Sequence, residues 1–183
     1  MNNFFLNDLL FLIPEIFFIF SIIVILIYSI FISNKYILLN NKKYNTPIIT
    51  SIVNNLIIYF LMILVILYFL NLNNFKILFT GQFVINYYSQ IGKILILAIT
   101  ILCLLTFNSY LKNNKINNYE YLILTIISVL SVCLLLNTND LLHYYIIIEL
   151  QSLCFYTITA LKKNNIYSSE AGLKYFILGS IIS

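Results

Sequence analysis

Residues 141–161 read LLHYYIIIELQSLCFYTITAL, an apolar run that holds one carboxylate, Glu149. If a helix opens at Asp140, Glu149 lies about 13.5 Å along it, at about 1.5 Å per residue. That depth is close to the midplane of a hydrocarbon layer about 30 Å thick. A charge there costs about 2.5–3.5 kcal/mol on insertion scales, so Glu149 is a candidate for a proton or ion pathway. The alternative is a protonated or paired glutamate that only joins helices.

The composition of the whole chain is that of an integral membrane protein. Its 183 residues are 62% hydrophobic and only 9% charged, with a mean hydropathy of +0.98, which excludes a water-soluble domain. Phe, Tyr, Ile, Asn and Lys are abundant and Arg is absent. This preference for residues with A/T-rich codons indicates an organelle-encoded protein. The net charge of +4 is explained by membrane topology and does not indicate nucleic-acid binding.

Apolar runs separated by Asn- and Lys-rich breaks predict an all-α fold, a polytopic transmembrane helix bundle in a single membrane domain, 1–183. The loop 71–90 mixes β-branched and aromatic residues around Gly81, which predicts a short hairpin outside the bilayer or a partly buried interfacial coil. The predicted spans are 9–32, 48–70, 91–110, 119–136, 140–161 and an incomplete last span, 168–183.

Lysines lie mainly in alternate loops, and this placement predicts the orientation. The first, third and fifth loops carry Lys35, Lys42, Lys43, Lys112, Lys115, Lys162 and Lys163. By the positive-inside rule these loops face the cytoplasm or the mitochondrial matrix. Lys93, at the entrance of the third span, is interpreted as a snorkelling anchor. Glu15 is expected near the membrane surface, in an end-of-helix role.

The last predicted span is too short to cross the bilayer alone. Its sixteen residues give roughly 24 Å of helix, against about 30 Å of hydrocarbon. An uncovered helix end in the bilayer leaves carbonyl groups unpaired at a cost of several kcal/mol. We therefore expect that a partner chain covers this end, or that this chain is split from a larger protein.

Polar side chains share one helix face with Glu149. Positions three, four and seven residues away are Tyr145, Ser152 and Tyr156, and Thr159 and Lys163 continue this line. A hydrated proton path needs such a polar line, although a hydroxyl-bearing helix interface would have the same pattern.

Two other ionisable residues, Lys174 and His143, are weaker candidates. Lys174 follows Glu170 by four residues, so the spacing favours an ordinary helix-surface ion pair over a functional lysine. His143 is more typical of an interfacial histidine than of a proton relay.

Small residues in the last span predict tight helix packing. Gly172 and Gly179 share a face, and Gly179 forms a small-xxx-small pair with Ser183, so another helix is expected to dock there. The cysteines, Cys103, Cys133 and Cys154, lack metal-ligand spacing. They are expected to be buried small residues without a metal or a disulfide.

Three stretches resemble subunit 2 of mitochondrial respiratory complex I, the NADH:ubiquinone oxidoreductase. The most specific is NDLLHYYIIIELQSLCFYTITALKKNNIYSSEAGLKYFILGS, residues 139–180, with the signatures ELQSL and EAGLKYFxLG. DLLFLIPEIFF, residues 8–18, is similar to the first helix of that subunit. FTGQFVINYYSQIGKILILAI, residues 79–99, is similar to its hairpin and third helix.

The resemblance implies an antiporter-like, proton-translocating membrane-arm subunit. It maps the ionisable glutamate of that family's channel onto Glu149 and a lysine of its polar axis onto Lys174. The family's further lysines would lie beyond Ser183. The chain therefore resembles the amino-terminal fragment of a split subunit, and the resemblance implies a second chain that carries the remaining helices.

The resemblance also implies cofactors, partners and a location. NADH, FMN, iron–sulfur clusters and ubiquinone are expected in other subunits, because this chain has no Gly-rich nucleotide loop or cysteine cluster. Other membrane-arm subunits and membrane lipids are the expected partners, and nucleic acid is not. The expected location is the mitochondrial inner membrane, crossed several times.

Two other functions are compatible with the sequence. One is a component of a multisubunit cation/proton antiporter, which shares the fold and the intramembrane Glu and Lys. The other is a purely structural membrane-arm subunit whose charged residues do not conduct protons.

Overall fold

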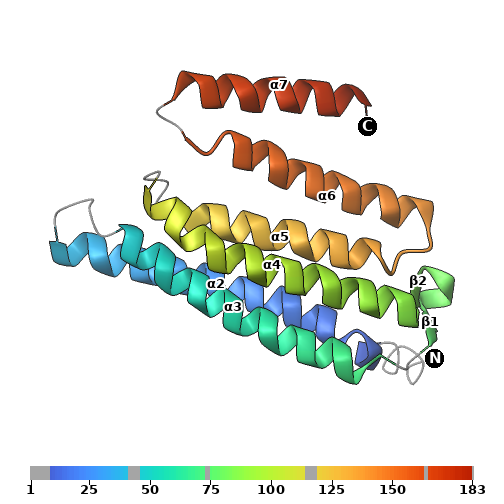
Figure 1. Ribbon diagram of the computed structural model, residues 1–183. Helices are drawn as coiled ribbons and strands as arrows, with labels where there is room; N and C mark the ends of the chain where they lie inside the picture. The colour runs from blue at the N-terminus through green and yellow to red at the C-terminus, as the bar shows by residue number, and fades with distance from the viewer. Residues whose placement is uncertain (1–8, 41–45, 73–74, 114–118, 163–164, 183) are drawn as a thin grey trace.

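The chain is described by a computed structural model that covers residues 9–40, 46–72, 75–113, 119–162 and 165–182. Long helices dominate it, with one small hairpin between the second and third of them (Figure 1). The helices are α2 (Ile13–Asn40), α3 (Thr46–Leu70), α4 (Tyr87–Asn113), α5 (Tyr119–Leu135), α6 (Leu141–Thr159) and α7 (Ile166–Ile182). The hairpin consists of β1 (Lys76–Leu78), the short 3-10 turn η2 (Phe79–Gly81) and β2 (Phe83–Ile85).

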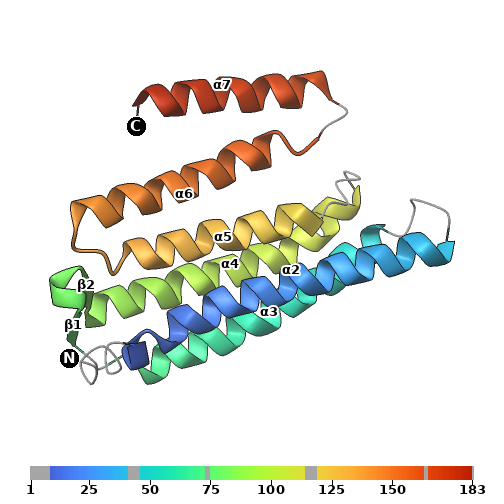
Figure 2. The same ribbon diagram turned by 180° about the vertical axis from the view of Figure 1, so that it is seen from behind.

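The helices form a four-helix bundle with a two-helix extension. Helices α2, α3, α4 and α5 pack against one another, α6 packs on α5, and α7 packs on α6. Figures 1 and 2 show the extension from opposite sides: α6 and α7 continue outward from α5 in one layer, so that α7 lies farthest from the bundle.

A stripe of apolar side chains on α3 forms the centre of the core. Val53, Ile57, Leu61, Leu64 and Tyr68 follow one another at intervals of three or four residues and are at most 2% exposed. That spacing places them on one helix face. The opposite face of α3 is also apolar but exposed, as expected of a helix that meets lipid.

In the part of the chain that the structure describes, four helices are long and apolar enough to cross a membrane: Ile13–Ser33, Ile49–Leu70, Tyr87–Thr106 and Leu141–Thr159. Helix α5 is apolar but shorter. Together with the composition, these helices show a multi-pass membrane protein.

The helices lie in the predicted ranges but end at different residues. Helix α2 continues to Asn40, beyond the predicted end at 32, and α4 runs from Tyr87 to Asn113, beyond both ends of 91–110. Hydropathy marks the membrane-embedded part of a helix, whereas Asn, Lys and Tyr can extend it into the interface.

The hairpin predicted around Gly81 is present. Its strands are antiparallel, with Lys76 opposite Ile85. The turn places Phe79, Thr80 and Gly81 at positive φ values of 48°, 56° and 100°, a region that glycine adopts most easily. In Figure 1 the hairpin lies at the end of the bundle where α4 begins and α5 ends.

The prediction that the three cysteines are buried is wrong for one of them. Cys133 and Cys154 are buried, but Cys103 is exposed on α4. An apolar side chain in a membrane helix can face lipid as readily as protein, so hydropathy does not separate the two cases.

Candidate proton-transfer sites

Glu149 lies in the middle of α6, eight residues after Leu141, or about 12 Å along the helix. Its side chain is half-buried. Ser152 donates its hydroxyl to the Glu149 backbone oxygen at 2.9 Å and lies 3.4 Å from the carboxylate Oε2. None of the ion pairs in the described residues includes Glu149. The carboxylate therefore sits at mid-helix with one weak hydroxyl partner.

The side chains on the polar face predicted around Glu149 differ in their exposure. Ser152 and Tyr156 are partly buried, as Glu149 is, whereas Tyr145 is 53% exposed. Thr159 is exposed, and its backbone oxygen accepts the Ser168 hydroxyl at 2.7 Å across the α6–α7 connection. The end of the predicted line at Lys163 lies outside the described residues, as do the loop lysines 42, 43 and 115.

Tyr156 forms the centre of the α6–α7 contact. Its ring meets Tyr175 and Phe176 edge to face, with centroids 5.0 and 5.6 Å away. A Cβ added at Gly179 would lie 1.8 Å from the Tyr156 hydroxyl, and one at Gly172 would lie 2.8 Å from the Ala160 Cβ. The close-packed seam predicted from the two glycines is therefore present, and α6 is the helix that docks on it. Ser183 lies outside the described residues.

Lys174 lies in the middle of α7 and pairs with Glu170. Its Nζ is 2.7 Å from Glu170 Oε1, and the two side chains are 71% and 53% exposed. The i,i+4 pair predicted from the spacing is therefore formed. Lys174 follows Ile166, the first residue of α7, by eight positions, which is about 12 Å along the helix. Glu149 lies at a similar distance from the start of α6.

His143 lies in the first turn of α6. Its Nδ1 is 3.6 Å from Asp140 Oδ2, and its ring meets Phe83 of the hairpin edge to face at 5.3 Å. The side chain is 31% exposed. These contacts suit a histidine at the end of a helix, and its part in proton transfer stays a prediction.

Glu15 and Lys93 form a buried ion pair, which corrects both of their predicted roles. Lys93 is completely buried and Glu15 is 6% exposed. Lys93 donates to Glu15 Oε1 and lies 4.8 Å from the centre of the Tyr68 ring. Lys93 is thus not a snorkelling anchor, and Glu15 is not a surface group at a helix end.

Asn137, just after α5, joins this pair. Its Nδ2 donates to the same Glu15 oxygen at 3.1 Å. Glu15 Oε2 and Asn137 Oδ1 are buried without a hydrogen-bond partner among the described residues. We call Glu15, Lys93, Asn137 and Tyr68 the buried polar cluster.

A topological signal could have revealed the pairing. In a chain that crosses the membrane back and forth, the first and third spans begin on the same side of the membrane. The second and fourth spans end on that side, so the four helix ends lie at the same level. Glu15 and Lys93 are each within the first turns of such spans, and Tyr68 and Asn137 are at the ends of the others. A buried lysine needs a counter-charge, and Glu15 is the acid at the matching depth.

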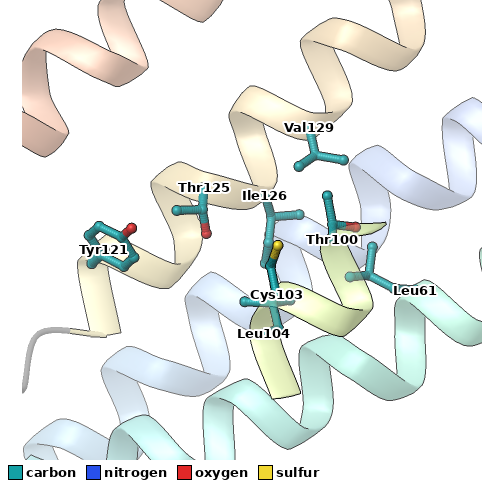
Figure 3. A pocket seen from close by; sticks show the side chains of 8 residues that line it. All are labelled: Leu61, Thr100, Cys103, Leu104, Tyr121, Thr125, Ile126 and Val129. Atoms are coloured by element: carbon teal, nitrogen blue, oxygen red, sulfur yellow. The ribbon is translucent and has the colours of Figure 1, made fainter. Parts of the chain in front are cut away.

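A groove lies between α3, α4 and α5 (Figure 3). Its lining residues include neither Glu149 nor any residue of the buried polar cluster. Its volume is about 300 Å³. The hydroxyls of Thr100 and Thr125 in its wall are used within their own helices, which leaves an apolar surface. The lining residues are Leu61, Thr100, Cys103, Leu104, Tyr121, Thr125, Ile126 and Val129.

Comparison with known proteins gives one consistent set of matches. The family model described as "NADH:quinone oxidoreductase/Mrp antiporter, TM" matches residues 138–183. NADH-ubiquinone oxidoreductase chain 2 of Marchantia polymorpha is 36% identical over 97% of this chain and 35% of the relative. NADH-quinone oxidoreductase subunit N of Pelagibacter ubique is 34% identical over the same shares.

A solved structure shares the fold. A chain of respiratory complex I from Thermus thermophilus with bound aureothin matches with a TM-score of 0.59 at 19% identity, over 88% of this chain and 33% of that one. The chain thus spans about a third of the length of these relatives. Over nearly its whole length the chain is similar to about a third of the chain 2 and subunit N proteins of NADH–quinone oxidoreductase, and residues 138–183 match the antiporter-related family model.

Proposed function

We propose that this chain is part of a proton-translocating membrane-arm subunit of respiratory complex I, in which Glu149 binds and releases a proton during coupling. The observation that carries the proposal is the mid-helix carboxylate on α6, within the segment that the antiporter family model matches. An ionisable group at that depth is costly unless it has a function or a partner.

The surroundings of Glu149 suit a group that changes its protonation. Burial favours the neutral carboxyl and a nearby cation favours the carboxylate. Glu149 is half-buried, and among the described residues Ser152 is the side chain that lies within hydrogen-bond distance of its carboxylate. The approach or withdrawal of a lysine can then decide whether the proton is held. We infer that this lysine is on a helix outside the present chain.

The exposed face of α7 offers a surface on which further helices of the same subunit would pack. Lys174 is 71% exposed near the middle of α7, and a lysine that faces lipid at mid-membrane depth costs about 2.5–3.5 kcal/mol. A polar protein neighbour removes most of that cost. We propose that the remaining helices of the subunit, carried by a second polypeptide, cover α7 and place Lys174 on the polar axis.

We further propose that the chain has no redox site of its own. NADH, FMN, iron–sulfur clusters and ubiquinone would bind to other subunits, and redox energy would reach Glu149 through the membrane arm. The Marchantia relative, a ubiquinone oxidoreductase chain, and the A/T-biased composition support a location in the mitochondrial inner membrane.

An antiporter component is the second candidate, because the description of the family model includes Mrp antiporters. The curated relatives favour complex I, since their names are those of NADH oxidoreductase subunits. Native purification and mass spectrometry of the partners test this choice. We expect other complex I subunits and a chain with the remaining helices. Recovery with antiporter subunits alone would contradict the proposal.

The role of Lys174 can be separated from that of its ion pair. If Lys174 is on the proton path, Lys174→Met should lower the number of protons pumped per electron, while Glu170→Gln should leave it nearly unchanged. If the pair is only structural, the two substitutions remove the same interaction and should have equal effects. Proton uptake by the complex in vesicles, measured with NADH oxidation, distinguishes these results. Glu149→Gln in the same assay should lower pumping and leave assembly intact.

A further inference from the structure

The buried polar cluster closes the end of the bundle where the hairpin lies. It joins α2, α3 and α4 through Glu15, Tyr68 and Lys93. The side chains of Lys93 and Asn137 are at most 1% exposed. A charged pair buried this completely holds one arrangement, because displacing either group leaves a charge without its partner.

Asn137 links this cluster to the connection between α5 and α6. Its side chain donates to Glu15, and its backbone oxygen accepts the amide of Val84 in the hairpin at 2.8 Å. The amide of Asn139 donates to the Gln82 backbone oxygen at 3.0 Å. The connection is therefore held by the bundle on one side and by the hairpin on the other.

This connection leads directly into the helix that carries Glu149. Helix α6 starts at Leu141 and packs on the bundle mainly through α5, and only a small share of its apolar stretch is buried. An α-helix transmits a shift of its first turn along its axis, because its backbone bonds are made within the helix. A shift of the connection at Asn137 would therefore move Glu149 along or around the axis of α6.

We propose that Asn137 is a positioning residue, which the buried Glu15–Lys93 pair anchors and which fixes α6 so that Glu149 meets its proton partners. The proposal rests on the proposed function of Glu149. The ion pair acts through Asn137 and takes no proton itself. Glu15 and Lys93 thus supply geometry, and Glu149 supplies the titrating group.

Two variants of the assembled complex test this proposal. Asn137→Ala cuts the link and keeps the ion pair. The double variant Glu15→Gln/Lys93→Met removes both charges and keeps a carbonyl oxygen for Asn137. Lys76→Met is the matched control, because Lys76 also lies over an aromatic ring, 5.0 Å from the centre of Phe11, but in the exposed hairpin. Hydrogen exchange over residues 82–84 and 137–139 reports the connection, and protons pumped per electron report function.

With Asn137→Ala we expect exchange at the connection to become about tenfold faster, because local opening is easier, and pumping to fall. The double variant and Lys76→Met should keep both readouts near those of the parent complex. If Asn137→Ala leaves exchange unchanged, the proposal is overturned. It is equally overturned if the double variant keeps slow exchange but loses pumping, since Glu15 or Lys93 would then titrate.

The exchange readout separates this proposal from the proposed function. Normal pumping in Glu149→Gln would refute the role of Glu149 and would leave the tenfold change in exchange as a property of the connection. Unchanged exchange in Asn137→Ala would refute the positioning role and leave the function of Glu149 intact.

Discussion

Replacing Lys93 with methionine should destabilise the protein far more than replacing an exposed lysine. Methionine has a similar length but no charge, so the change removes the ammonium group that contacts Glu15 and the Tyr68 ring. Glu15, 6% exposed, then remains buried without its cation and keeps the hydrogen bond from the Asn137 amide.

The expected cost follows from the burial of the pair. Removing one partner of a buried ion pair costs about 3–5 kcal/mol, because the other charge stays uncompensated. Removing both charges costs little in comparable pairs, so Glu15→Gln/Lys93→Met should recover all but about 1 kcal/mol of that loss. Lys76→Met, which loses only an exposed cation–π contact, should cost about 1 kcal/mol or less.

The assay is unfolding of the full chain in a mild detergent by increasing amounts of sodium dodecyl sulfate, followed by far-UV circular dichroism. The parent, Lys76→Met and the double variant should have similar free energies of unfolding. Lys93→Met should have a much lower one. A cost for Lys93→Met no larger than that for Lys76→Met would refute a buried ion pair. A double variant as unstable as the single one would show that the charges do not compensate each other.

Two further predictions concern the α6–α7 seam and the cysteines. Gly179→Ala should loosen the seam, because the added Cβ would lie 1.8 Å from the Tyr156 hydroxyl. The overpacking should lower the free energy of unfolding by about 1–3 kcal/mol. The higher helix propensity of alanine should restore about 1 kcal/mol of it. A double-mutant cycle with Tyr156→Leu should remove this penalty, and strictly additive effects would contradict the contact. Cys103 should react with N-ethylmaleimide in detergent much faster than the buried Cys133. Equal rates measured by mass spectrometry would show that the placement of α4 is wrong.

The helices and the depth of Glu149 could be predicted from the sequence, because the cost of polar groups in hydrocarbon forces long apolar runs to be helical. The seam at Gly172 and Gly179 followed from the same local reasoning, since small residues at helical spacing allow close approach. The ion pair Lys174–Glu170 required only a separation of four residues.

The pairing of Glu15 with Lys93 was not predicted, because each residue was interpreted from its distance to the end of its own helix. Seventy-eight residues separate the two in sequence, so the contact depends on which helices are neighbours. Hydropathy does not carry this information, because lipid and protein interior are equally apolar. The same limit explains why Cys103 was expected to be buried.

The proposed role of Glu149 in proton translocation can be tested in the assembled complex. Its most direct test is the number of protons pumped per electron by the complex in sealed vesicles, with Glu149→Gln compared to Glu120→Gln. Glu120 is an exposed carboxylate in the first turn of α5, so the same chemical change there serves as a control. We predict that Glu149→Gln lowers the ratio while the complex still assembles, and that Glu120→Gln keeps the parent value. An unchanged ratio in Glu149→Gln would contradict the claim.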